Sequence, residues 1–204
     1  MFLFQTMAVI MSNEEKILEG QIRECYGRVV YTHKTHEKAA DILLDKQSNI
    51  KKCQIILSAI IAGGMISMIF DFDCLKDYKK VSGFITAIIS TILLVLNSYT
   101  KDYDLGAIAQ KHRQAGADLW VIREKYLSLL TDLRINRLSI QEMCKIRDSL
   151  MKELGAIQKN APSTDSKAYN EAKQALKEKE ELTFSDDEID KLLPTNLRKN
   201  GEGN

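Results

Sequence analysis

Two uncharged apolar runs separated by a short charged connector constrain this chain more than any other feature of its sequence. The first run is CQIILSAIIAGGMISMIF, residues 53–70, and the second is VSGFITAIISTILLVLNSY, residues 81–99. An α-helix rises about 1.5 Å per residue, so each run spans roughly 27 to 29 Å, close to the bilayer's hydrocarbon thickness of about 30 Å. The runs predict a transmembrane helical hairpin whose external connector is residues 71–80. The alternative is a pair of buried core helices, but adjacent uncharged runs of this length are rare in soluble domains.

The distribution of lysine and arginine around the hairpin predicts its orientation. Basic residues within 15 positions of the outer ends outnumber those in the connector: Lys38, Lys46, Lys51, Lys52, Lys101, Lys111 and Arg113 against Lys76, Lys79 and Lys80. Loops rich in lysine and arginine remain in the cytoplasm. We therefore expect a multi-pass membrane protein with both termini cytoplasmic. Of the four cysteines only Cys74 would lie outside, so no intrachain disulfide is expected.

The segments that flank the hairpin repeat apolar residues at alternating steps of three and four, a spacing typical of helices that pack along a seam. One series lies in residues 12–52, which we expect to form an N-terminal helix, and the other in residues 100–135, which we expect to form a second long helix. A hairpin makes the two run antiparallel as neighbours. The register that levels both membrane exits pairs these residues: Leu43 with Leu105, His36 with His112, Val29 with Leu119 and Ile22 with Tyr126. We expect a two-helix cytoplasmic stalk continuous with the hairpin.

The remaining segments complete an all-α membrane protein. Residues 136–194 predict C-terminal helices, one of them over about residues 166–181. Capping boxes, in which a serine and a glutamate three positions later satisfy free amides of the first turn, predict helix starts at Ser12, Ser139 and Ser185. Residues 1–11 lack the features of a signal peptide, and we interpret them as a disordered stretch from an upstream start. Residues 195–204 predict a disordered tail.

The sequence lacks the motifs that carry most enzyme chemistry. It contains no phosphate-binding glycine-rich loop, nucleophile elbow, zinc signature or paired-carboxylate arrangement. Neither apolar run carries a charged residue that could do chemistry within the membrane. A net charge of +1 gives no field that would attract nucleic acid. We therefore expect no enzyme activity, no cofactor, no metal and no direct nucleic-acid binding.

Small and polar residues in the two runs suggest roles inside the membrane. Small residues that let helix backbones approach occur at steps of four: Ala59, Gly63 and Ser67 in the first run, and Gly83 and Ala87 in the second. We interpret them as packing faces within the hairpin or between copies. Polar residues align on one side of the second run and are candidates for lining a pore: Ser82, Thr86, Ser90 and Asn97. The alternative is that serine and threonine bond back to their own helix and that Asn97 anchors at the interface.

Two further groups lie in the soluble part. His36 and His112 predict a polar layer that sets the register of the stalk, with a pH-sensitive or metal-binding layer, helped by His33, as the alternative. Basic residues gather around the break after the second long helix and could hold the phosphates of a nucleotide: Arg123, Arg134, Arg137, Lys145 and Arg147. The alternative for these charges is an ordinary solvated helix surface.

Short motifs on both sides of the hairpin resemble those of a known family. They are Tyr31-Thr-His-Lys-Thr-His36, Ala109-Gln-Lys-His-Arg113 followed by Ala115, Leu119 and Tyr126, Ala161-Pro-Ser-Thr164, Ala168-Tyr169 and Leu192-Leu-Pro194. Their order over about residues 15–198 resembles the SLATT family, the SMODS and SLOG-associating two-transmembrane effectors. The resemblance implies a bacterial inner-membrane effector of anti-phage defence that disrupts the membrane by forming a pore. It also implies neighbours such as nucleotide-second-messenger synthases, nucleotide-sensing domains or reverse transcriptases.

The residues and the resemblance together predict a pore-forming effector. It would depolarise the inner membrane and cause growth arrest or death, the outcome called abortive infection. Two helices cannot enclose a pore, so this function requires a homo-oligomer in the bilayer. The expected trigger is a nucleotide second messenger or a partner enzyme, such as a nucleotide synthase or a reverse transcriptase. The alternative is a non-conducting anchor or scaffold that holds such a partner at the membrane.

Overall fold

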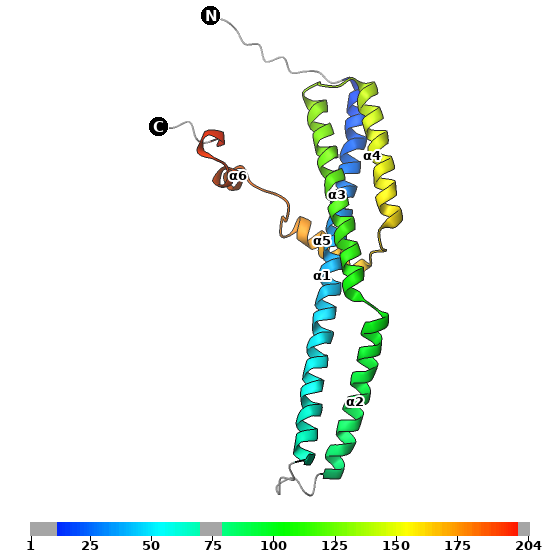
Figure 1. Ribbon diagram of the computed structural model, residues 1–204. Coiled ribbons are helices and arrows are strands. Elements are labelled where there is room, and N and C mark those ends of the chain that lie inside the picture. Colours follow the sequence, from blue (N-terminus) through cyan, green and yellow to red (C-terminus); the bar gives the residue numbers. More distant parts are fainter. Residues whose placement is uncertain (1–11, 70–78, 200–204) are drawn as a thin grey trace, which may run out of the picture.

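The computed structural model of the chain describes residues 12–69 and 79–199, and every regular element within these ranges is a helix. The molecule is elongated, with a helical bundle at one end and a two-helix hairpin at the other (Figure 1). The elements are α1 (Asn13–Ile69), α2 (Lys79–Asp102), α3 (Leu105–Arg134), α4 (Ile140–Asn160), α5 (Ser166–Lys177), α6 (Asp186–Leu192) and the 3-10 helix η2 (Thr195–Leu197). The predicted all-α class with a two-helix apolar hairpin is confirmed.

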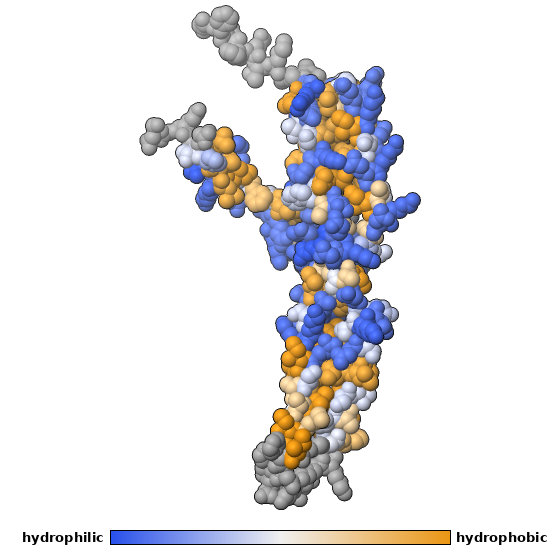
Figure 2. All heavy atoms as spheres, viewed as in Figure 1, coloured by the Kyte–Doolittle hydropathy of each residue, from blue (hydrophilic) through white to orange (hydrophobic). Residues whose placement is uncertain are grey.

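The hairpin consists of α2 and the C-terminal half of α1, and its apolar side chains point outward. Ile55, Phe84 and Leu94 are each about two-thirds exposed, at 69%, 69% and 65%. Both arms contain an 18-residue stretch apolar enough to cross a membrane, and none of either stretch is buried inside the protein. Figure 2 shows apolar and weakly polar residues over this end and charged residues over the bundle. A core helix would bury such residues, so exposure favours contact with lipid.

The opposite end of the molecule is a bundle of three helices. The N-terminal half of α1 packs antiparallel against α3, and α4 folds back along both. Ile22, Leu119 and Tyr126 are fully buried between α1 and α3, and α4 adds Met143 and Leu150 to the same core. The expected antiparallel pair of long helices is therefore present, and α4 covers one side of its seam.

The second arm of the molecule has a short break between α2 and α3. Asp104 caps α3, since its Oδ1 accepts a hydrogen bond from the amide of Ala107 at 2.9 Å. Gly106 follows, and a Cβ at this position would lie 2.9 Å from Nε2 of Gln47. The small residue thus allows α1 to pass close to the break. By contrast, α1 is continuous across the boundary that we placed at residues 52 and 53.

The capping boxes predicted at Ser12, Ser139 and Ser185 are present, each with its glutamate bonded back to the serine. The helix predicted to end near Glu181 instead ends at Lys177. Beyond it Glu180 and Leu182 have positive φ values of 51° and 77°, a conformation that cannot continue a helix.

The last described residues differ from the expected disordered tail. They form η2, and the amide of Lys199 donates to Asp190 Oδ1 at 3.1 Å. The predictions for residues 1–11, for 200–204 and for most of the connector fall outside the described residues.

Candidate functional site

The two membrane helices meet at a close contact between Gly64 and Thr86. A Cβ placed on Gly64 would lie 2.9 Å from Oγ1 of Thr86, too close for any larger residue without a shift. The Thr86 hydroxyl donates to the carbonyl of Ser82 at 2.9 Å, so it also satisfies a group of its own helix. Gly64 is therefore the small residue that packs the hairpin, and our sequence argument had singled out its neighbour Gly63 instead.

The four polar residues of α2 do not share one surface. Ser82 and Thr86 are half-buried towards α1, whereas Ser90 and Asn97 are exposed. Asn97 Oδ1 accepts a hydrogen bond of 2.9 Å from Nε2 of Gln54, which lies on α1. Of these four residues, Ser90 and Asn97 therefore lie on a flank of α2 that is open to the surroundings. Gln54 was missed, although it is the polar residue that follows Cys53 at the start of the first run.

The small residues at steps of four lie mostly on outer faces of the hairpin. Ala59, Gly63 and Ala87 are exposed, and a Cβ on Gly63 would meet no atom within 4 Å. Gly83 is half-buried. The side chain of Ser67 is outside the described part of the structure. The Ala59 and Gly63 face is therefore free to pack against another helix in the membrane.

The bundle brings His36 and His112 into direct contact. Their Nδ1 atoms lie 2.9 Å apart, and the two rings are 5% and 3% exposed. Since a hydrogen bond needs one donor and one acceptor, one ring carries its proton on Nδ1 and the other leaves Nδ1 bare. Burial, with a smaller effect from nearby His112 and His33, lowers the pKa of His36 to about 4. Burial also lowers the pKa of His112, so both rings are neutral at pH 7.

The residues beside this pair form a polar stretch that is unusual for a helix core. His33, Lys34 and Thr35 are all buried. His33 donates from Nδ1 to the carbonyl of Gly116 at 2.9 Å. Its ring packs edge-on with that of Trp120, with 5.4 Å between the ring centroids. Within the described ranges, no three His, Cys, Asp or Glu side chains converge in a way that could hold a metal ion. His36 and His112 are instead hydrogen-bonded to each other, and His33 is bonded to the backbone of Gly116.

A long-range ion pair ties the C-terminal segment to this polar stretch. The ammonium of Lys34 lies 2.7 Å from Glu181 and 2.9 Å from Glu37. Burial opposes protonation of Lys34, but the bonds to Glu181 and Glu37 outweigh it and raise its pKa. The same contact lowers the pKa of Glu181. Just before it, α5 lies against α1, where the rings of Tyr31 and Tyr169 stack at 6.2 Å.

The predicted basic cluster does not converge on one point. Arg134 pairs with Glu19 at 2.7 Å, Arg147 with Asp148 at 2.7 Å and Arg137 with Asp132 at 3.5 Å. Arg123 lies over the ring of Trp120, 4.3 Å from its centroid, on the side where α1 and α3 meet. Lys145 is an exposed residue of α4. The carboxylates offset most of this charge, so the arrangement matches a solvated helix surface better than a phosphate site.

Comparison with known families decides where this architecture belongs. The sequence profile of the SMODS and SLOG-associating 2TM effector domain, family 4, matches residues 18–188. The chain belongs to the SLATT family. No curated protein and no solved structure matches the chain significantly.

The matched range of this SLATT protein covers the residues of the candidate site. It begins at Leu18 in the first buried turns of α1 and ends at Glu188 in α6, so it includes the hairpin, the histidine pair and Glu181. Membership makes the chain a two-transmembrane membrane effector of defence systems, and the family's name links it to nucleotide-related partner proteins. SLATT domains are helical membrane domains and are not known as an enzyme family.

Proposed function

We propose that this SLATT protein assembles into a homo-oligomeric pore that depolarises the bacterial inner membrane and causes growth arrest or death. The observation that carries the proposal is the hairpin, whose outer surface is mostly apolar and holds Ser90 and Asn97 together on one flank of α2. A single hairpin buries too little surface to enclose a path for ions, so several copies are needed. The open face at Ala59 and Gly63 supplies a surface on which hairpins pack closely.

The arrangement of polar groups favours one lining. When α1 of each hairpin packs against a neighbour, α2 is left to face the centre of the ring. Ser90 and Asn97 are exposed on the flank of α2 and would then meet water. Ser82 and Thr86 sit between the two helices and contribute less than their spacing in the sequence suggested.

The trigger acts on the cytoplasmic side in this proposal. The excess of basic residues outside the connector supports a cytoplasmic position for both termini and for the three-helix bundle. A nucleotide second messenger, or a partner such as a nucleotide synthase or reverse transcriptase, would meet the bundle there. Asp71, Asp73 and Asp77 of the connector, which lie outside the described residues, would repeat around the outer mouth and favour cations.

Replacing Ser90 with leucine tests the pore. Thr86 is a poor target because a larger side chain would press on Gly64 and disturb the hairpin itself. Ser90→Leu should leave insertion and assembly unchanged and abolish depolarisation, read with a potential-sensitive dye after induction in intact cells. Thr91→Leu is the matched control, because Thr91 is an exposed hydroxyl residue one position further along the helix. The Thr91→Leu variant should still depolarise the membrane.

The competing function is a membrane scaffold without conduction. One observation favours it: Thr86 and Asn97 already have hydrogen-bond partners inside the hairpin, which leaves few polar groups for a wet path. A scaffold would tolerate Ser90→Leu. Full toxicity of that variant, or killing by the wild type without a change in membrane potential, would contradict the pore and favour the scaffold.

A further inference from the structure

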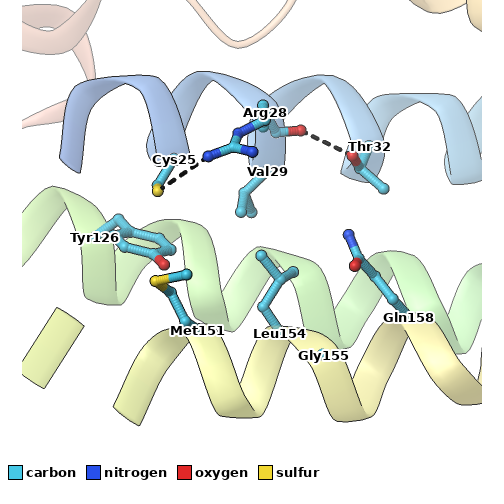
Figure 3. Close-up of a pocket in the computed structure, with 9 residues that line it drawn as sticks. All are labelled: Cys25, Arg28, Val29, Thr32, Tyr126, Met151, Leu154, Gly155 and Gln158. Carbon is cyan, nitrogen blue, oxygen red and sulfur yellow. Dashed lines mark hydrogen bonds between the residues drawn. The ribbon is translucent and has the colours of Figure 1, made fainter. Parts of the chain in front are cut away.

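A cavity of about 220 Å³ lies between α1, α3 and α4, away from the membrane hairpin. Figure 3 shows residues of all three helices turned towards it. Its walls are mostly apolar, with Val29, Met151 and Leu154 around the space. An apolar cavity of roughly 150 Å³ in a protein core is known to admit a benzene ring. This cavity is larger, and it therefore has room for a planar ring.

The hydroxyl of Tyr126 gives the cavity a specific polar group. Tyr126 is 0% exposed, yet its hydroxyl has no hydrogen-bond partner among the described residues. Figure 3 shows this hydroxyl on the cavity side of the ring, beside Met151. The neighbouring polar atom is the sulfur of Cys25, a weak acceptor that contributes to the raised pKa of Tyr126 and already accepts a hydrogen bond from Arg28. An unpaired buried hydroxyl weakens folding, so its place on a cavity wall points to a ligand that completes the hydrogen bond.

The protonation state of Tyr126 suits a donor. Burial raises the pKa of its hydroxyl to about 12. The group therefore keeps its proton at neutral pH and can donate to an acceptor atom on a bound ring.

Arg28 supplies a positive charge at the mouth of the same cavity. Its Nη2 donates only to the sulfur of Cys25, at 3.4 Å, and its Nε lies 3.9 Å from Glu24 on an exposed surface. Sulfur is a weak acceptor, so an anionic group would form stronger bonds with this guanidinium. Gly155 stands across the mouth on α4, where a Cβ would meet no atom within 4 Å. The entrance therefore combines open space with a cation.

We propose that this cavity binds a small anionic compound that contains a planar ring. The ring lies between Val29, Met151 and Leu154, an acceptor on the ring bonds to the Tyr126 hydroxyl, and the anionic group bonds to Arg28. Such a ligand touches all three helices of the bundle at once. The site goes beyond the pore, since binding here requires no membrane potential and no conduction.

The test uses the purified full-length protein in a nonionic detergent. The probe is 4-nitrophenyl phosphate, which carries an acceptor at one end of a ring and a dianion at the other. Isothermal titration should show saturable binding to the wild type. Gly155→Leu, which fills the mouth, should weaken binding by at least tenfold. Gly20→Leu is the matched control, because Gly20 is an exposed glycine of α1 with equally open surroundings, and it should bind like the wild type.

Two conservative variants separate the polar contacts. Tyr126→Phe should weaken binding of the probe by roughly five- to tenfold, while the unliganded protein melts at the same temperature or higher because an unpaired hydroxyl has been removed. Arg28→Gln should weaken binding of 4-nitrophenyl phosphate but leave binding of the neutral analogue 4-nitroanisole unchanged.

Several results would overturn the site. They are an absence of saturable binding, binding that Gly155→Leu does not reduce, and binding that Tyr126→Phe leaves unchanged. If Gly155→Leu fails to fold by circular dichroism, the Tyr126→Phe result decides alone. The binding measurement is independent of depolarisation, so failure of the ligand site and failure of the pore are separate outcomes.

Discussion

His36 and His112 share a single hydrogen bond, with their Nδ1 atoms 2.9 Å apart in the core of the cytoplasmic bundle. The bond requires that at least one ring is neutral with a bare Nδ1, because two imidazolium rings would each present only donors. Asp165 raises the pKa of His112 somewhat, but burial outweighs it. The contact joins α1 to α3 at the level where α5 also meets α1.

We predict that the bundle loses stability in mild acid. The pKa of His36 falls from 6.5 in the unfolded chain to about 4 in the folded protein, so the unfolded state binds more protons between these values. Stability is therefore fully present above pH 6.5 and is lost as the pH drops through about 4, by roughly 3 kcal/mol. Thermal unfolding followed by circular dichroism between pH 7.5 and 4 measures the loss.

The double variant His36→Leu with His112→Leu is the control for this acid effect. It removes both titrating rings from a buried layer, so its melting temperature should vary much less with pH. A wild-type melting temperature that is constant down to pH 4 would contradict the prediction, and so would an equal acid loss in the double variant.

The sequence predicted the contact between the two histidines because it depends on local spacing. A hairpin and two seams with steps of three and four leave one antiparallel register that levels both membrane exits. The position of α4 could not be derived in this way, since its apolar face fits either groove beside the seam. Glu181 pairs with Lys34 and Lys38, which lie 147 and 143 positions earlier in the sequence. No local pattern reports such a pair.

The hairpin shows a similar division. The length of the two apolar runs predicts the membrane helices, but the rotation of each helix about its own axis depends on how the side chains fit together. In the structure this rotation turns Gly64, and not Gly63, towards α2. Placement of Ser90 on the outer flank and Thr86 on the inner face follows from that rotation. A step of four residues turns a helix by about 40°, so a series of such steps drifts off one face.

The neighbouring glycines of α1 should respond differently to the same substitution. Gly64→Leu should separate α1 from α2, because even a Cβ would lie 2.9 Å from Thr86 Oγ1. Cysteines at positions 54 and 97, in a background without native cysteines, report the separation because the native side chains lie 2.9 Å apart. Their oxidative crosslinking should fall several-fold in Gly64→Leu.

Gly63→Leu is the matched comparison for this experiment. A Cβ there meets nothing within 4 Å, so the hairpin crosslink should survive. If the Ala59 and Gly63 face packs between copies, the same variant should reduce crosslinking between molecules. Equal effects of the two leucines on the crosslink within one hairpin would contradict the assigned rotation of α1.

Glu181→Gln should release the C-terminal segment from α1. The variant removes the carboxylate that lies 2.7 Å from the Lys34 ammonium and 3.4 Å from that of Lys38. Trypsin should then cleave after Lys177 and Lys179 several-fold faster in limited digestion followed by mass spectrometry. Glu178→Gln changes a nearby exposed glutamate and should digest like the wild type. Identical rates for the two variants would show that the ion pair does not hold this segment.

Single-cysteine variants should fix the orientation in the membrane. A chain that retains only Cys74, in the connector, should react with a membrane-impermeant thiol reagent in intact cells. A chain that retains only Cys144, on α4, should react only after the cells are opened. The opposite pattern would place the bundle outside and reverse the orientation derived from lysine and arginine.

The unbroken course of α1 has a mechanical consequence. From His36 to Ile69 it runs through 34 residues without interruption, roughly 50 Å at about 1.5 Å per residue. A tilt of about 5° at the histidine pair would carry the far end of such a rod sideways by about 4 Å, close to one helical turn of about 5.4 Å. The neighbouring membrane helix α2 is separated from α3 by the break at Asp104, so α2 can keep its position. A small repacking of α1 in the bundle would thus displace its far end within the bilayer by several ångströms, with no need for the bundle as a whole to move toward the membrane.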